Sequence, residues 1–144
     1  HEMLYLARSE VNRLLATSMG LGSRLPAYCT SIGRVLLAQL SEPALARYFA
    51  AIELQPYTEF TITTEARLRA ELARIREQDY AVVDQELELN VRAISVPVRS
   101  ASGKACGAVN VSVKAARVPL ERLTGEFLAP MRQAVARIGE FLAA

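Results

Sequence analysis

The amino-acid sequence predicts an α+β domain in which helices pack on the faces of an antiparallel sheet. Apolar side chains between residues 68 and 75 recur every three or four positions, as on the buried face of a helix. Residues Ala93–Val98 and Ala105–Val113 alternate as strands do, and Ser102-Gly103 between them favours a hairpin turn. With 144 residues and 51% hydrophobic side chains, the chain can bury the core of one domain.

Each remaining element has a local signal in the sequence. Serine and threonine are preferred N-cap residues of helices, and short apolar runs suit buried strands. In chain order we expect strands at Met3–Ala7 and Arg13–Ser18, helices starting at Thr30 or Ser31, at Ser41 and at Thr64, a linking loop at Gln55–Thr63, and a strand at Ala81–Val83. Apolar side chains recur at helical spacing from Leu120 to Leu142, which predicts a C-terminal helix. Pro130 within it should kink or restart this helix.

Composition and charge exclude several classes of protein. Seventeen basic and fifteen acidic residues leave a net charge of +2, which is too small to indicate nucleic acid or acidic lipid as a direct partner. No apolar run approaches the roughly 20 residues of a membrane helix. Two cysteines make no disulfide framework, so we expect a cytoplasmic protein. The one histidine, His1, excludes almost every histidine-based site, so we expect no metal and no cofactor.

The strand at Ala105–Val113 carries a face of small and polar side chains. Its valines share the opposite face, which is typical of a hydrophobic core. The small and polar set consists of Cys106, Ala108, Asn110 and Ser112, and the neighbouring strand adds Ala93, Ser95 and Pro97. Such a face is either solvated, or covered by a helix, or the floor of a pocket whose ligand satisfies Asn110 and Ser112.

A second candidate site is the helix start at Thr30 and Ser31. Hydroxyl side chains followed by Gly33 leave backbone N–H groups and the positive end of the helix dipole for a carboxylate or phosphate. Plain N-capping explains the same residues and is favoured by spacing alone. Arg34 and Arg92 are candidate direct partners of a carboxylate, since a guanidinium binds it through two hydrogen bonds, although Arg34 can equally face solvent.

An acidic segment and a cysteine are the remaining candidates for chemistry. Asp84, Glu86 and Glu88 share one face if their segment is extended, and a solvated strand end explains them better than catalysis or a metal site. Cys29 has no internal histidine to activate it as a thiolate. The sequence therefore predicts a protein that is not an enzyme.

Two blocks of the sequence resemble the effector-binding domain of IclR-type bacterial transcriptional regulators. The first block, GSRLPAYCTSIGRVLLAQL (Gly22–Leu40), has the Leu-Pro, Thr-Ser and Gly-Arg pairs that precede a leucine-rich helix in that family. The second block, Arg74–Val113, has the family's acidic element, apolar-Pro strand and hairpin in the same order. The first block is most similar to the subgroup that controls protocatechuate and 4-hydroxybenzoate catabolism.

The resemblance implies a GAF-like, single effector-binding domain over residues 1–144, without the family's N-terminal winged helix-turn-helix. His1 stands where a natural chain begins with Met, which is expected of a fragment. The resemblance also implies a homodimer or homotetramer that touches DNA only through the missing domain. Its effector would be a small organic acid of the protocatechuate, 4-hydroxybenzoate or β-ketoadipate class.

The ligand-binding residues come from the resemblance and the helix start together. The expected set is Thr30, Ser31, Gly33, Asp84, Ala93, Asn110 and Ser112. Asn110 stands where the family has Ser, and Ala93 where some members have Cys, so the short keto-acids of other members need not be the effector here. Two alternatives stay open: an oligomerisation domain with a filled interior, and a hydrolase of small acids that uses Cys29 or the pair Asp84 and Glu86.

Overall fold

The computed structural model describes residues 1–7, 9 and 22–143, and in these ranges three antiparallel strands form the main sheet. They are β3 (Ala81–Asp84), β4 (Val91–Arg99) and β5 (Ala105–Lys114), in the order β3-β4-β5. The predicted hairpin joins β4 to β5. At its turn Gly103 has a φ of +77° and donates its N–H to Ser100 O at 2.8 Å.

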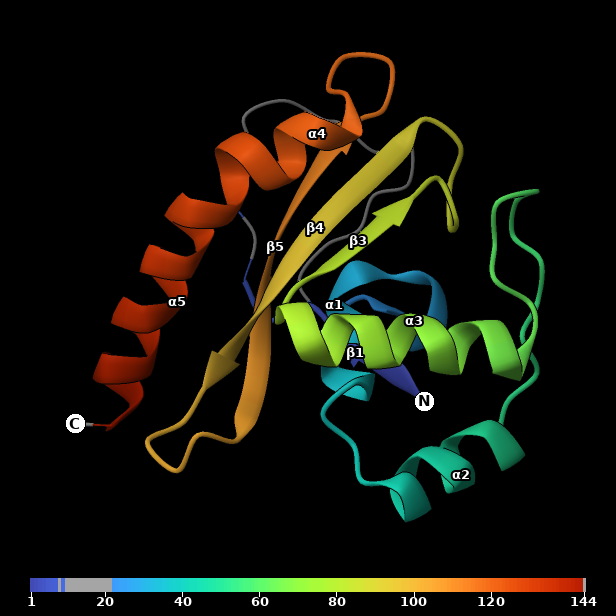
Figure 1. The fold of residues 1–144 in the computed structure, drawn as a ribbon, viewed down its shortest axis with the longest axis horizontal. Coiled ribbons are helices and arrows are strands. Elements are labelled where there is room, and N and C mark those ends of the chain that lie inside the picture. The colour runs from blue at the N-terminus through green and yellow to red at the C-terminus, as the bar shows by residue number, and fades with distance from the viewer. Residues whose placement is uncertain (8, 10–21, 144) are drawn as a thin grey trace.

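Helices cover both faces of this sheet (Figure 1). The helical elements are α1 (Ser31–Leu37), α2 (Glu42–Ala50), α3 (Glu65–Gln78), α4 (Leu120–Arg122), the π-helical η2 (Leu123–Phe127) and α5 (Leu128–Ala143). α1 lies on one face of the sheet with α3 against it, and α5 crosses the other face. This is the predicted arrangement of an antiparallel sheet between helices.

A second, small sheet brings the N-terminus next to the start of α1. Its strands are β1 (Glu2–Leu4) and β2 (Arg24–Pro26), which pair antiparallel, and a 3-10 helix, η1 (Ala27–Cys29), leads from β2 into α1. The strand expected at Met3–Ala7 is therefore present but shorter. The strand expected at Arg13–Ser18 lies outside the described residues.

The predicted helix starts are confirmed. The Thr30 side chain accepts the Gly33 N–H at 3.3 Å, and the Thr64 side chain accepts the Arg67 N–H at 3.4 Å. Each bond satisfies one of the N–H groups that have no acceptor inside the helix. Ser41 is the N-cap of α2, although its side chain makes no capping hydrogen bond.

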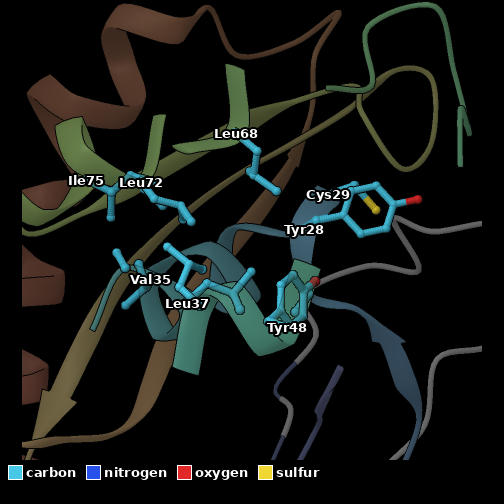
Figure 2. Packing of buried hydrophobic residues seen from close by; sticks show 12 residues of the cluster. Tyr28, Cys29, Val35, Leu37, Tyr48, Leu68, Leu72 and Ile75 are labelled. Atoms are coloured by element: carbon cyan, nitrogen blue, oxygen red, sulfur yellow. The ribbon is translucent and has the colours of Figure 1, made fainter. Parts of the chain in front are cut away.

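The hydrophobic core is divided by the sheet into two clusters. In the first, the apolar stripe of α3 packs on α1, as Figure 2 shows for Leu68, Leu72 and Ile75 facing Val35 and Leu37. Burying side chains of this size contributes about 1.5–3 kcal/mol each. The second cluster joins the valine face of β4 and β5 to η2 and α5. The two faces of β5 therefore differ as the sequence predicts, since its valines point toward α5.

The C-terminal helix is irregular one turn before Pro130, in η2, and not at Pro130 itself, where the sequence predicts the kink or restart. A proline has no N–H and crowds the carbonyl four residues before it, here that of Glu126. Glu126 lies in η2, where the chain takes the wider π-helical turn, and α5 then continues through Pro130. No helix in the described ranges is long and apolar enough to cross a membrane.

Candidate ligand-binding site

A cavity lies between the start of α1, the small-residue face of the main sheet and the N-terminal β1–β2 pair. It holds about 460 Å³ of unfilled space, counting the part that opens to solvent. Its walls are formed by Met3, Tyr5, Leu25, Cys29, Thr30, Ser31, Ile32, Val83, Leu87, Glu88, Val91, Ala93, Asn110 and Ser112. Concave sites with mostly apolar walls and a few placed polar groups are the usual form of small-molecule pockets.

The sheet provides the floor of this cavity. Antiparallel pairing sets Ala93 opposite Ser112 and Ser95 opposite Asn110, so all four lie on one face. Asn110 Nδ2 donates to Ser112 Oγ at 2.9 Å. An amide NH2 has two donors and a hydroxyl has one, so each side chain still has a hydrogen to offer a ligand. α1 covers part of this face, where Ser95 is fully buried, whereas Asn110 and Ser112 are half-buried and Cys106 is exposed.

The start of α1 forms the wall above that floor. Ser95 is fully buried and its Oγ donates to Ser31 Oγ at 2.8 Å, which ties the helix start to β4. Ser31 accepts this bond, so its own O–H can donate to a bound group. The Thr30 hydroxyl instead donates to Pro26 O at 3.1 Å while it caps Gly33. Ser31 is thus the better placed hydroxyl for a ligand.

The structure brings together five of the seven expected residues and places two elsewhere. Thr30, Ser31, Ala93, Asn110 and Ser112 all line the cavity.

Gly33 and Asp84 do not line the cavity. The Gly33 N–H is already used by Thr30, and its Cα faces the backbone of Ala27. The Asp84 carboxylate accepts from Arg92 Nε at 2.9 Å, and Arg92 Nη1 donates to Val118 O at 2.8 Å. Arg92 therefore holds β3 and β4 together and does not face the cavity as a carboxylate partner.

Arg34 and Glu86 correct two further expectations. Arg34 does not face solvent but is 1% exposed, and Glu86 is not on a solvated strand end but 7% exposed. The guanidinium donates through Nη1 and Nη2 to the two Glu86 oxygens at 2.6 and 2.5 Å, and through Nε to Tyr28 O at 2.6 Å. Neither side chain lines the cavity. Arg34 and Arg92, the two side chains expected to bind a ligand carboxylate, are thus both bonded to other groups of the domain.

Sequence reasoning missed the cavity walls that are formed by β1, β2 and the loop between β3 and β4. Met3 lies opposite Leu25 in the β1–β2 register, and both reach the cavity. Leu87 and Glu88 reach it from the loop between β3 and β4. Apolar side chains in short strands look the same whether they line a pocket or fill a core, so no local signal could distinguish them.

The Cys29 thiol lies on the cavity wall in the protonated form. Burial is the main cause that raises its pKa to about 12, opposed by the nearby Arg34 charge. The side chain is 0% exposed. A thiol of this pKa is a poor nucleophile at neutral pH, which argues against the hydrolase alternative.

We expect iodoacetamide at pH 8 to alkylate Cys106 at least about a hundred-fold faster than Cys29. With a pKa of about 12, only about one Cys29 thiol in ten thousand is ionised at that pH. Cys106 is exposed. Peptide mass spectrometry over time measures both rates in one sample, and equal rates would contradict a closed, protonated Cys29.

In the described part of the chain, no three His, Cys, Asp or Glu side chains converge to hold a metal ion.

Comparisons with known proteins agree with this architecture. Residues 1–140 match the family model described as bacterial transcriptional regulator IclR C-terminal. The Pca regulon regulatory protein of Pseudomonas putida is 42% identical over 128 residues, which is 88% of this chain and 44% of that protein. The p-hydroxybenzoate hydroxylase transcriptional activator of Acinetobacter baylyi is 34% identical over 137 residues, 92% of this chain and 51% of that protein. The chain thus spans about half the length of these curated relatives.

A solved structure gives the same fold. It is the inducer-binding domain of the PobR transcription factor from Acinetobacter, a double mutant in complex with 3-hydroxybenzoic acid. The TM-score is 0.90 at 34% identity, with 96% of this chain and 82% of that chain covered. The matched relatives regulate transcription and are not enzymes. The chain belongs to the IclR family of bacterial transcriptional regulators and corresponds to the C-terminal, effector-binding domain of its members.

Proposed function

We propose that this domain senses a small aromatic or dicarboxylic acid and passes the signal to a DNA-binding part of the same regulator. The observation that carries the proposal is the cavity beneath α1, with apolar walls and polar side chains at two separate places. The relatives support the class of ligand, because one is a p-hydroxybenzoate hydroxylase activator and another was solved with 3-hydroxybenzoic acid. Protocatechuate, 4-hydroxybenzoate and β-ketoadipate are the acids we would expect first.

The arrangement of donors suggests how such an acid would lie. A buried carboxylate without hydrogen-bond donors costs several kcal/mol, so donors must meet it. We place the carboxylate at the start of α1, beside the Ser31 hydroxyl, and the apolar ring between Ile32 and Leu87. Asn110 and Ser112 would then orient the other end of the ligand from the floor. A ring hydroxyl suits that end, since it can both donate to and accept from these side chains.

The whole regulator would respond by a shift in population. An effector that binds one arrangement of the oligomer better than another moves the equilibrium toward it, by no more than the difference in its affinity for the two. We propose that the regulator is a homodimer or homotetramer, that it binds DNA through a winged helix outside this domain, and that it works in the cytoplasm.

A thermal-shift screen tests the proposal. The panel is protocatechuate, 4-hydroxybenzoate, β-ketoadipate, pyruvate and glyoxylate. At 100 times its Kd a ligand adds about 2.7 kcal/mol to the free energy of unfolding. For a domain of this size we expect a rise in Tm of about 5–10 °C with one of the first three acids.

The control variants locate the binding site. In Asn110→Ala/Ser112→Ala the shift should disappear, because both floor donors are removed. Ser100→Ala/Ser102→Ala removes two hydroxyls from the exposed β4–β5 turn and should keep the shift. A shift that survives the first double variant would move the site away from this cavity. No shift with any acid would favour the oligomerisation domain with a filled interior.

A further inference from the structure

Two walls of the effector cavity come from segments that are far apart in the sequence. One wall is the stretch from η1 into α1, which contributes Cys29 and Ser31. The other is the loop between β3 and β4, residues 85–90, which contributes Leu87 and Glu88. Any change in the distance between these walls changes the shape and the opening of the cavity.

One buried ion pair, whose side chains do not line the cavity, joins the two walls. Arg34 extends from α1 and binds both carboxylate oxygens of Glu86, which immediately precedes Leu87 in the loop. The third arm of the guanidinium, Nε, binds the Tyr28 carbonyl of η1. Arg34 therefore holds η1, α1 and the loop at fixed distances from one another, yet it makes no part of the cavity surface.

The segment after α2 adds a second set of bonds to the same loop. Thr58 Oγ1 donates to Gln85 O at 2.7 Å, and Thr61 Oγ1 donates to Glu86 O at 2.6 Å. The Ile62 N–H donates to Glu86 Oε2 at 3.0 Å. Glu86 is thus held through its main chain and its side chain, and within the described part of the chain only its carboxylate bonds to α1.

The backbone of this loop needs such anchors. Gln85 and Asn90, at its two ends, have φ values of +61° and +62°, a region in which residues with a Cβ are disfavoured. The bonds from Gln85 N to Val91 O and from Asn90 N to Gln85 Oε1 close the base of the loop, and the segment after β5 donates two N–H groups to Asn90. Glu86 adds the bonds that connect the loop to α1.

We propose that Arg34 and Glu86 are positioning residues for the effector cavity: the buried pair holds the β3–β4 loop against α1 and so sets how far the cavity opens. This role rests on the proposed function in one respect, that the cavity is the effector site. Whether the pair controls access to the cavity can be measured without any effector.

The test uses Cys29 as a reporter inside the cavity. The double variant Arg34→Met/Glu86→Gln removes both charges together, so no unpaired charge stays buried, and the glutamine oxygen can still accept from Ile62 N–H. Removing the Arg34 charge, which lowers the pKa of Cys29, would by itself slow alkylation, so a faster reaction reports access. We expect iodoacetamide to alkylate Cys29 about ten-fold faster or more in this variant. The exposed Cys106 serves as the internal standard and should react at an unchanged rate.

A second arginine–carboxylate pair, which is largely exposed, serves as the control. Asp79→Asn/Arg99→Met removes the ion pair between the end of α3 and the end of β4, whose side chains are away from the cavity lining. Cys29 alkylation should keep its wild-type rate in this control. An equal gain in both double variants would overturn the proposal, because it would show that loss of any ion pair loosens the domain.

The urea dependence of the alkylation rate separates local opening from global unfolding. Local opening of the loop exposes little surface, so the rate of Cys29 alkylation in Arg34→Met/Glu86→Gln should change little with low urea. A rate that rises as steeply as the global unfolding equilibrium, or a rate equal to wild type, would overturn the proposal.

The effector makes the two proposals distinguishable. In the wild-type domain, 4-hydroxybenzoate at saturating concentration should protect Cys29, and in Arg34→Met/Glu86→Gln its Kd should rise about ten-fold or more. If 4-hydroxybenzoate and the rest of the panel protect nothing in the wild type, the proposed function fails, while the change in Cys29 rate still decides whether the pair controls the cavity. If they bind the double variant with the wild-type Kd, the positioning role is wrong.

Discussion

Changing Glu86 to glutamine alone is expected to lower the free energy of unfolding by about 3–5 kcal/mol. The variant keeps the size of the side chain but leaves the Arg34 guanidinium, which is 1% exposed, without a counter-charge. Arginine stays protonated in proteins and so cannot escape this cost by losing its proton. The Tyr28 carbonyl still accepts from Nε, yet a single neutral acceptor does not replace a bidentate carboxylate. Urea unfolding followed by circular dichroism measures the loss.

Two other variants show that the loss comes from burial and not from a missing ion pair as such. Glu126→Gln breaks the exposed pair with Arg122 on the C-terminal helical stretch and should leave the urea midpoint unchanged. Adding Arg34→Met to Glu86→Gln should restore most of the stability, since a neutral buried pair costs far less than one charge. A single Glu86→Gln variant as stable as wild type would mean that water reaches Arg34.

Elements with local signals could be predicted from the sequence. Thr30 and Thr64 cap helices because a hydroxyl can accept an N–H three residues ahead, whatever the rest of the chain does. The turn at Ser102-Gly103 is likewise decided by the residues in it, since Gly103 has the positive φ that the turn requires. These features need no long-range contact, which explains why the structure has them where the sequence predicts them.

The floor of the candidate site could also be predicted, because it depends on a period of two. Once residues 105–113 form a strand, Asn110 and Ser112 must share a face, and the valines that alternate with them must point away. That part of this face lies under the start of α1 depends on tertiary contacts. The sequence alone left it open between solvent, a helix and a ligand.

The same reasoning failed two residues beyond the end of β3. Asp84, Glu86 and Glu88 share one face only if the strand continues, but Gln85 has a φ of +61° and turns the chain. Glu86 therefore points inward, to an arginine 52 residues away in sequence. No pattern of charges in the sequence predicts such a buried pair, because each partner alone resembles an ordinary surface residue.

Gly33→Ala is the second substitution with a large expected effect, a loss of about 3 kcal/mol in the free energy of unfolding. Inside a helix this change is normally favourable by up to about 1 kcal/mol. Here a Cβ on Gly33 would lie 2.2 Å from Ala27 O and 2.3 Å from Ala27 Cα. Both are backbone atoms and cannot rotate aside, so η1 must move away from α1. Thermal unfolding of the variant measures the loss.

Gly125→Ala is the matched control for the effect of glycine itself. Gly125 lies in η2, and nothing is within 4 Å of the place its Cβ would take. We expect this variant to be as stable as wild type or slightly more stable, because alanine loses less backbone freedom on folding. The movement of η1 in Gly33→Ala should also displace Cys29 from the cavity wall, so its alkylation should become faster, whereas Gly125→Ala should leave that rate unchanged. If both variants were equally stable and Cys29 equally slow, η1 would not pack on α1 as closely as the structure shows, and the wall above the sheet floor would have a different shape.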